Sequence, residues 1–188
     1  MILWPRLLDV LHPADRPPPE SWQTCYEAKY ALARLLAPRR IFEIGVRAGY
    51  SAFVFLTACP SADYLGIDAN TDTHGGFAGA ISHARKILGP FRATVLETTT
   101  AGFADTFAQS HATSFDLVHI DGDHTNRGCA FDLEFSLRLN PQHIVVDDYR
   151  EIPDVRAACD QFCDSHSSDF TRLVIDDGHN GFALLTRC

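Results

Sequence analysis

The sequence predicts an α/β fold with a mostly parallel sheet of seven strands, helices on both faces and an antiparallel hairpin at its C-terminal end. Five short apolar runs alternate with segments of helical character, which is the order of consecutive strand–helix–strand units. Each of these runs is followed at once by a glycine or an acid, as strands often are at the functional edge of such a sheet. Two further strand-like runs flank an Asp/Gly/Asn cluster at 176–181, which is typical of a hairpin.

Helices are expected between the strands, and the residues that stop them are visible in the sequence. Ser21 can cap the first helix, and Pro38 ends it because proline cannot continue a helix. Asn140 and Pro141 end a later helix in the same way. The expected helices cover residues 22–36, 52–56, 75–88, 101–109, 125–139 and 153–166. The expected strands cover residues 41–44, 64–67, 93–96, 115–120, 144–146, 170–175 and 182–186.

Length and composition suggest one domain with a short leading segment. The 188 residues favour a single domain, assigned to 20–188, and the proline-rich stretch 1–19 is expected to be an extended arm. A net charge of −8 argues against non-specific nucleic-acid binding, which needs a basic surface. No run approaches the ~20 apolar residues of a membrane span. Without a recognisable signal peptide, the six cysteines are expected to be reduced thiols in the cytoplasm.

A loop with two glycines follows the first expected strand. Gly45 and Gly49 would let a ligand approach the backbone, and the helix that follows offers N–H groups to an anion. Asp68 ends the second strand, where an acid reaches the two hydroxyls of a ribose. Glu43 would repel a pyrophosphate but suits an ammonium group. S-adenosylmethionine, which has an amino-acid head, a ribose and no phosphate, fits this pattern; a glycine-rich turn without any ligand is the alternative.

Acids follow two strands that are expected to be neighbours. Asp121, Asp123 and His124 come after the fourth strand, and Asp147 and Asp148 come after the fifth. Because the carboxyl ends of parallel strands meet at one edge of a sheet, these groups predict an acidic pocket for a divalent metal, with Mg²⁺ the expected ion. The alternative is that the acids cap the next helix or lie in a solvated turn.

These motifs resemble those of a known enzyme family. Residues 43–49 together with Asp68 resemble the first motif and the ribose-binding acid of class I S-adenosylmethionine-dependent methyltransferases, which implies their Rossmann-like fold. Residues 120–124 and 146–149 are similar to those of metal-dependent small-molecule O-methyltransferases. That group includes the macrocin and mycinamicin sugar methyltransferases, the cephalosporin-hydroxylase-like proteins and, more distantly, catechol O-methyltransferase.

The resemblance implies a role for each matching residue. The implied metal ligands are Asp121, Asp147 and Asp148. The implied cofactor contacts are Gly45, Gly49, Tyr50, Ser51, Asp68 and Asp121, with Glu43 supporting the methionyl amine. His124 matches the general base proposed in one branch of the family and Asp123 the base proposed in another, so the choice between them stays open.

The implied reaction is O-methylation of a hydroxylated small molecule, such as a sugar or a natural-product intermediate. The metal would lower the pKa of the acceptor hydroxyl, and His124 or Asp123 would accept its proton. The alternatives are a metal-independent methyltransferase that acts on nitrogen or oxygen, and a non-catalytic module that binds the cofactor. Because the chain offers little material for an acceptor pocket, a homo-oligomer is one way to complete it.

Overall fold

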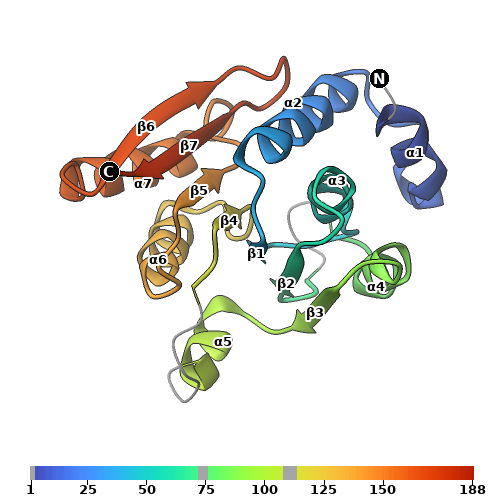
Figure 1. Cartoon of the computed structure of the whole chain (residues 1–188), viewed down its shortest axis with the longest axis horizontal. Helices are drawn as coiled ribbons and strands as arrows, with labels where there is room; N and C mark the ends of the chain where they lie inside the picture. The colour runs from blue at the N-terminus through green and yellow to red at the C-terminus, as the bar shows by residue number, and fades with distance from the viewer. Residues whose placement is uncertain (1–2, 72–75, 108–113) are drawn as a thin grey trace.

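The structure is a computed structural model that describes residues 3–71, 76–107 and 114–188. Its centre is a seven-stranded sheet with the order β3-β2-β1-β4-β5-β7-β6 (Figure 1). All neighbouring strands are parallel except β7, which runs antiparallel to both β5 and β6. The predicted fold class is therefore confirmed. The strands are β1 (Arg40–Ile44), β2 (Asp63–Asp68), β3 (Ala93–Glu97), β4 (Leu117–Ile120), β5 (His143–Val146), β6 (Phe170–Ile175) and β7 (Phe182–Arg187).

Helices cover both faces of the sheet. The helices α1 to α4 pack on one face and α5 to α7 on the other (Figure 1). This placement gives a three-layer molecule whose strand ends emerge between the two helical layers. The helices are α1 (Leu3–Val10), α2 (Ser21–Leu36), α3 (Tyr50–Ala58), α4 (Ala80–Leu88), α5 (Thr100–Phe107), α6 (Asn126–Leu137) and α7 (Pro153–Ser165), and a 3-10 turn covers Pro13–Asp15.

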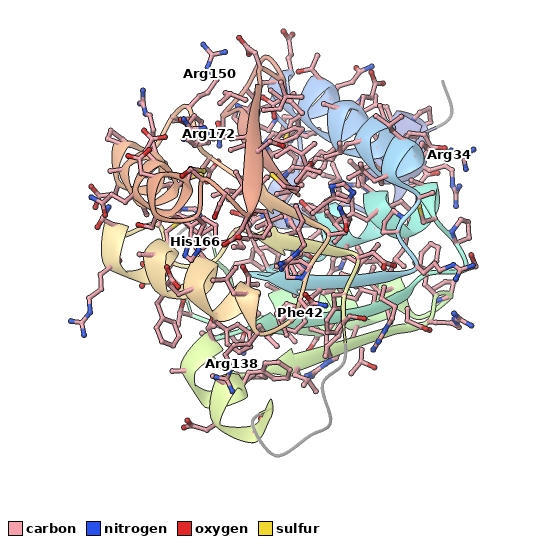
Figure 2. All side chains as sticks on the ribbon, turned by 60° about the vertical axis from the view of Figure 1, so that its left-hand side comes forward. Arg34, Phe42, Arg138, Arg150, His166 and Arg172 are labelled. Atoms are coloured by element: carbon pink, nitrogen blue, oxygen red, sulfur yellow. The ribbon has the colours of Figure 1, made fainter. Side chains whose placement is uncertain are left out.

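Alternation along the strands divides the core into two parts. Ile41 and Leu117 face the layer of α1 to α4, whereas Phe42 and Val118, one residue further along, face the layer of α5 to α7. Successive side chains of a strand point to opposite faces, so each strand contributes to both parts. In Figure 2 the aromatic ring of Phe42 lies inside the molecule. This alternation also decides which acids at the strand ends reach solvent, as described below.

Residues 3–19 differ from the expected extended arm. Residues Leu3–Val10 form α1, and Leu3, Leu7 and Leu11 are buried in the core. The physical reason is their spacing of four residues, which puts three leucines on one face of a helix. Pro5 lies in the first turn of α1, where proline is tolerated, and the other prolines of this stretch come after the helix, from Pro13 onward. A domain boundary at residue 19 stays a prediction.

Two expected helices extend into parts of the chain that lie outside the described residues. Gly75, the expected start of one helix, belongs to the stretch 72–75, and the described helix α4 begins at Ala80. The expected end at 108–109 also lies outside, and α5 is described as far as Phe107. Within the described ranges, none of the helices has both the length and the apolar character needed to cross a bilayer.

Candidate active site

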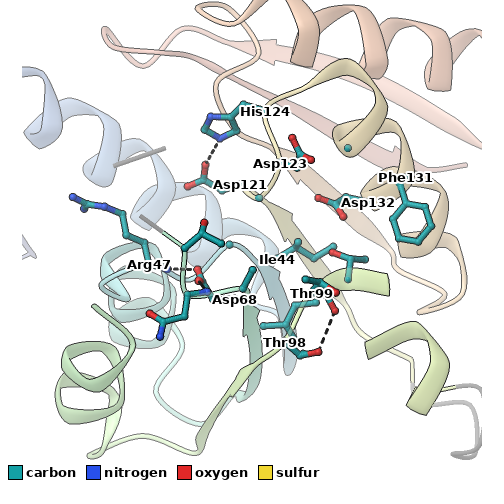
Figure 3. A pocket seen from close by; sticks show the side chains of 18 of the residues that line it. Ile44, Arg47, Asp68, Thr98, Thr99, Asp121, Asp123, His124, Phe131 and Asp132 are labelled. Atoms are coloured by element: carbon teal, nitrogen blue, oxygen red, sulfur yellow. Dashed lines mark hydrogen bonds and ion pairs between the residues drawn. The ribbon is translucent and has the colours of Figure 1, made fainter. Parts of the chain in front are cut away.

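A cavity of about 720 Å³ opens at the carboxyl ends of β1 to β4 (Figure 3). The sheet order reverses between β1 and β4, and ligands of open α/β sheets bind at such a switch point. Gly45 and Asp68 line the cavity, as do Asp121, Asp123 and His124. Five of the residues that the sequence singled out are therefore brought to one place.

Gly45 lets two neighbouring strand ends approach closely. Its φ is +88°, and a Cβ at this position would lie 1.9 Å from the carbonyl oxygen of Asp121. The loop is then tied to β2, because the backbone N–H of Arg47 donates to Asp68 Oδ2 at 2.7 Å. Asp68 Oδ1 accepts from the backbone N–H of Asn70 at 2.7 Å. Asp68 is thus held in a fixed orientation at the wall of the cavity.

Glu43 does not line this cavity, which differs from its predicted contact with a methionyl amine. It is wholly buried, and its Oε1 accepts from His119 Nδ1 at 2.8 Å. Its Oε2 accepts from the hydroxyl of Tyr64. The reason is strand alternation: Ile44 points toward the cavity side, so Glu43 points to the opposite face, below α3.

Gly49 and Tyr50 also lie outside the cavity wall. A Cβ at Gly49 would lie 2.9 Å from the Cβ of Ala84, so this glycine allows α3 and α4 to pack closely. The Tyr50 hydroxyl donates to Asp15 Oδ2 at 2.7 Å, which ties the helix start to the N-terminal segment. Both residues have a packing role here, and their contacts with the cofactor stay predictions.

An open cluster of two carboxylates and one imidazole lies at the ends of β4 and β5. We call Asp121, His124 and Asp148 the open cluster, and one ligand atom from each lies within 4.8 Å of the others. His124 Nε2 is 3.2 Å from Asp121 Oδ1 and 3.3 Å from Asp148 Oδ2. Figure 3 shows the His124 ring directed at Asp121. The side-chain amide of Asn180 donates to Asp148 Oδ1 and orients this second carboxylate.

The open cluster concentrates negative charge. The hydrogen bond that His124 donates to Asp121 raises the pKa of His124, while partial burial opposes that rise. Burial is the main cause that raises the pKa of Asp148 to about 6, and the nearby carboxylates of Asp121 and Asp147 add to it. A bound cation would relieve this repulsion between carboxylates.

Asp147 is not part of the open cluster, and its role as a metal ligand stays a prediction. Its Oδ2 forms an ion pair with Lys29 Nζ and lies 3.7 Å from His119 Nε2. Lys29 also donates to Ser51 Oγ at 3.3 Å, so Ser51 lies away from the cavity as well. Although burial alone would raise the pKa of Asp147, the Lys29 ammonium and His119 lower it. Asp147 is therefore a buried carboxylate with cationic partners.

Strand alternation explains the different positions of the two adjacent acids. Asp147 continues the register of Val145, which packs toward α2, and so its carboxylate meets Lys29 of that helix. Asp148 has a φ of +56°, which turns the chain and directs its carboxylate to His124. The two adjacent carboxylates therefore lie in different environments, Asp147 beside Lys29 and Asp148 beside His124.

Asp123 lines the cavity, but its carboxylate is used at the start of α6. Its Oδ1 accepts from the backbone N–H of Thr125 at 2.9 Å. A Cβ at Gly128 would lie 2.1 Å from Asp123 Cγ, so the carboxylate packs against the first turn of α6. The N-cap of α6 is Thr125, so this geometry favours a role for Asp123 in fixing the turn before the helix over that of a general base.

Sequence reasoning missed Lys29 and assigned no role to His119. The buried residues of α2 are Cys25, Lys29, Leu32 and Ala33, which form one stripe. A lysine in a buried stripe requires a carboxylate partner, and that signal was available from helical spacing alone. The carboxylates of Asp147 and Glu43 raise the pKa of His119 to about 9 although its burial acts in the opposite direction. His119 is thus a buried imidazole that lies between the carboxylates of Glu43 and Asp147.

Comparison with known proteins gives matches in family, sequence and structure. The family described as "Methyltransferase domain" matches residues 42–149. The uncharacterized protein y4gI of Sinorhizobium fredii is 29% identical over 61% of this chain, but the match covers only 13% of that much longer protein.

Solved structures share the whole architecture. An O-methyltransferase from Bacillus cereus in complex with SAH has a TM-score of 0.73 and 18% identity, over 98% of this chain and 90% of that one. The O-methyltransferase TomG from Streptomyces achromogenes, in complex with SAM, has a TM-score of 0.67 and 21% identity, over 86% of this chain and 78% of that one. At these identities the likeness shows the fold alone.

Proposed function

The chain belongs to the methyltransferase domain family, and we propose that the protein transfers the methyl group of S-adenosylmethionine to a hydroxyl of a small molecule with the help of a divalent cation. The observation that carries this proposal is the position of the open cluster. Asp121 and His124 line the same cavity as Gly45 and Asp68, so acids and imidazole face the place where a nucleoside would bind. A donor and an acceptor oxygen could then meet in one cavity.

We infer one orientation for the cofactor in the cavity. Asp68, fixed by the backbone N–H groups of Arg47 and Asn70, offers its carboxylate to the ribose hydroxyls. Gly45 leaves room for the cofactor to pass close to the backbone between β1 and β4. In this orientation the sulfonium methyl faces Asp121 and His124.

The donor atoms of the open cluster suit a hard divalent cation such as Mg²⁺. Asp121 and Asp148 would hold it through carboxylate oxygens, and Asn180 would keep Asp148 in place. When bound, such a cation would lower the pKa of an acceptor hydroxyl and orient it. Asp147 stays with Lys29 and takes no part in this site.

His124 is the side chain we assign as the proton acceptor. Its Nε2 faces Asp121 and Asp148, beside the place where an acceptor oxygen would lie. The proton of the acceptor hydroxyl moves to His124, a bond forms between that oxygen and the methyl carbon, and the bond from this carbon to sulfur breaks. The products are the methyl ether, the protonated imidazole and S-adenosylhomocysteine.

A second candidate function is metal-independent methyl transfer, and the ion pair of Lys29 with Asp147 favours it. The pair supplies a fixed cation next to the open cluster and removes one of the three carboxylates expected to bind a metal. In that case His124 alone would activate the acceptor.

One assay separates these functions from a module without activity. Methyl transfer from labelled S-adenosylmethionine to a panel of vicinal diols and catechols is measured with EDTA and after addition of Mg²⁺ or Mn²⁺. Loss of transfer with EDTA supports the metal-dependent reaction, and transfer that EDTA leaves unchanged contradicts it. Cofactor binding without any transfer contradicts both reactions. Asp148→Ala should behave as the chelated enzyme does, while Asp164→Ala, at an exposed position on α7, serves as the control.

We also propose a compartment and partners for this reaction. We place the protein in the cytoplasm, because its six cysteines are free thiols and such thiols persist in a reducing compartment. The proposed partner is a hydroxylated small molecule, and a second copy of the chain is proposed to complete the acceptor pocket. Size-exclusion chromatography with light scattering measures whether a dimer forms.

A further inference from the structure

Two cysteines lie four residues apart near the end of α7. Cys159 and Cys163 are neighbours on one face of the helix, because residues i and i+4 are adjacent on a helix surface. Cys159 is wholly buried in the core, whereas Cys163 is only partly buried and packs at the edge of the same core. Both are free thiols. One sulfur of the pair is thus near solvent, and the other lies beneath it.

A guanidinium group from β6 lies beside this pair. Arg172 forms an ion pair with Asp160, the residue after Cys159, and its Cζ lies 5.6 Å from the ring centroid of Tyr149. The Tyr149 hydroxyl donates to Asp160 Oδ1 at 2.7 Å, so these three side chains hold one another in place. Figure 2 shows Arg172 on the side of the molecule where α7 lies. Arg172 also donates a hydrogen bond to the sulfur of Cys163. The cation is therefore fixed next to this thiol.

The hydrogen bond between the two sulfurs has a direction. The S–H of Cys159 donates to Cys163, which raises the pKa of Cys159 and lowers that of Cys163. Partial burial and the Asp160 carboxylate oppose the lowering at Cys163, while Arg172 adds to it. The C-terminal end of a helix also disfavours a negative charge. A thiolate at Cys163 therefore depends on the donors from Cys159 and Arg172.

Two other cysteines of the core show the opposite effect. Burial raises the pKa of Cys25 and of Cys129 to about 12, so these thiols keep their protons. A protonated, buried thiol is inert, because the thiolate is the nucleophile. Reactive cysteines are partly exposed and lie beside a cation. Cys163 has both properties.

We propose that Cys163 is a modification site for low-molecular-weight disulfides, with Cys159 and Arg172 as the groups that stabilise its thiolate. This inference is independent of the proposed methyl transfer. The thiol of Cys163 gives its proton to solvent, and its sulfur attacks one sulfur of the reagent RS–SR. A bond forms between these two sulfurs, the S–S bond of the reagent breaks, and RS⁻ leaves with the electron pair and takes up a proton. Cys163 is oxidised to a mixed disulfide, and one half of the reagent is reduced to RSH.

Cys159 has the part of a hydrogen-bond donor in this reaction. Because its thiol is buried and keeps its proton, it does not attack the mixed disulfide on Cys163. The adduct should therefore persist until an external thiol removes it.

Alkylation of each cysteine as a function of pH tests the assignment. The full chain is treated with iodoacetamide, and peptide mass spectrometry measures the rate at every cysteine. The rate at Cys163 is expected to have its midpoint near pH 7, against about 8.5 for an ordinary thiol. Cys159→Ala and Arg172→Gln should each move the midpoint toward the ordinary value, which lowers the thiolate fraction at pH 7 by about 3–10-fold. Cys159→Ser should stay close to the wild type, because a hydroxyl can also donate.

The controls separate this role from a general effect on the fold. Arg156→Gln removes an exposed cation from the same helix and should leave the midpoint unchanged. Circular dichroism checks that each variant is folded, and Arg172→Gln changes only a surface strand if Cys159→Ala proves unstable. A midpoint of Cys163 at the ordinary value, or an unchanged midpoint in Arg172→Gln, would overturn the assignment.

Exposure of the wild type to glutathione disulfide gives a second readout. One glutathione is expected on Cys163, at a time when Cys25 and Cys129 are still unmodified, and dithiothreitol should remove it. A disulfide between Cys159 and Cys163 in place of this adduct would overturn the role of Cys159 as a donor. Absence of an adduct at Cys163 would overturn the modification site itself.

Discussion

Two groups of charged side chains lie next to each other at the ends of β4 and β5, and their contrast explains the site. The buried network consists of Lys29, Glu43, Tyr64, His119 and Asp147, in which Asp147 pairs with Lys29 and Glu43 with His119. The open cluster has two carboxylates around one imidazole and borders the cavity through Asp121 and His124. Each carboxylate of the first group has a basic side chain as its partner, although Asp147 Oδ1 and His119 Nε2 make no hydrogen bond. The second group has two carboxylates for one imidazole, an excess of acidic groups that a ligand can compensate.

The difference teaches that an acid at a strand end is not by itself a functional group. Asp147 and Asp148 are adjacent in the sequence, but strand alternation sends the first toward α2 and a positive φ turns the second toward His124. The partner that each carboxylate meets decides whether it stabilises the fold or stays available for chemistry.

The largest expected effect is the loss of stability when Asp147, a member of the buried network, is replaced. Asp147→Ala leaves the Lys29 ammonium buried without its partner, and such a loss costs about 3–5 kcal/mol in the free energy of unfolding. Asp148→Ala should cost less than about 1 kcal/mol, because it relieves repulsion within the open cluster. Urea unfolding of both variants measures the two changes in the free energy of unfolding. Equal destabilisation would contradict the distinction between the buried network and the open cluster.

A second prediction concerns the rate of methyl transfer. His124→Gln removes the proton acceptor and should lower kcat by about 10²–10⁴-fold, with little change in stability or in affinity for S-adenosylhomocysteine. His143→Gln, at a half-buried histidine outside the cavity wall, is the control. Steady-state kinetics measures kcat, and a rate within a factor of three of the wild type would exclude His124 as the base.

A third prediction sharpens the link between the open cluster and the cofactor. Gly45→Ala would place a Cβ against the backbone of Asp121 and add the strain of a positive φ, which costs about 1–3 kcal/mol for the strain alone. Gly79→Ala is a matched control, because its φ is also +88° but nothing lies within 4 Å of the added Cβ. Binding of S-adenosylhomocysteine should be lost only in the first variant. Equal affinities in the two variants would show that the close approach at Gly45 is unimportant.

The smallest expected effect is at Asn180. This residue orients Asp148 without bordering the cavity, so Asn180→Ala should weaken Mn²⁺ binding about 10-fold, as the loss of such supporting groups commonly does. Electron paramagnetic resonance titration of Mn²⁺ measures the affinity directly. An unchanged affinity would mean that Asp148 does not hold the ion.

The sequence was sufficient to predict the fold and the location of the residues that directly follow strands. Alternating apolar runs predicted every strand, and Gly45, Asp68, Asp121 and His124 lie at the cavity as their places after strands implied. Motif position alone could not show that Asp147 belongs to the core, because that depends on a partner from a distant helix.

Other features of the structure had a sequence pattern that predicted them, but a second pattern was given more weight or the pattern was not used. The leucines of α1 have helical spacing, but the prolines after them suggested an extended arm. Glu43 lies two residues after Ile41, which is a core residue. Strand alternation therefore already predicted that the Glu43 carboxylate would point to the same buried face. Asp132 lies three residues after buried Cys129 on α6, and only the folded structure shows that this acid borders the cavity.

The most direct test of the central claim is a crystal structure of the protein with S-adenosylhomocysteine and Mn²⁺, with the ion located by its anomalous scattering. We expect one ion bound by the carboxylates of Asp121 and Asp148 beside His124, with Lys29 still paired to Asp147. An ion bound by Asp147 with Lys29 displaced, or no ion at the open cluster at saturating Mn²⁺, would contradict the account.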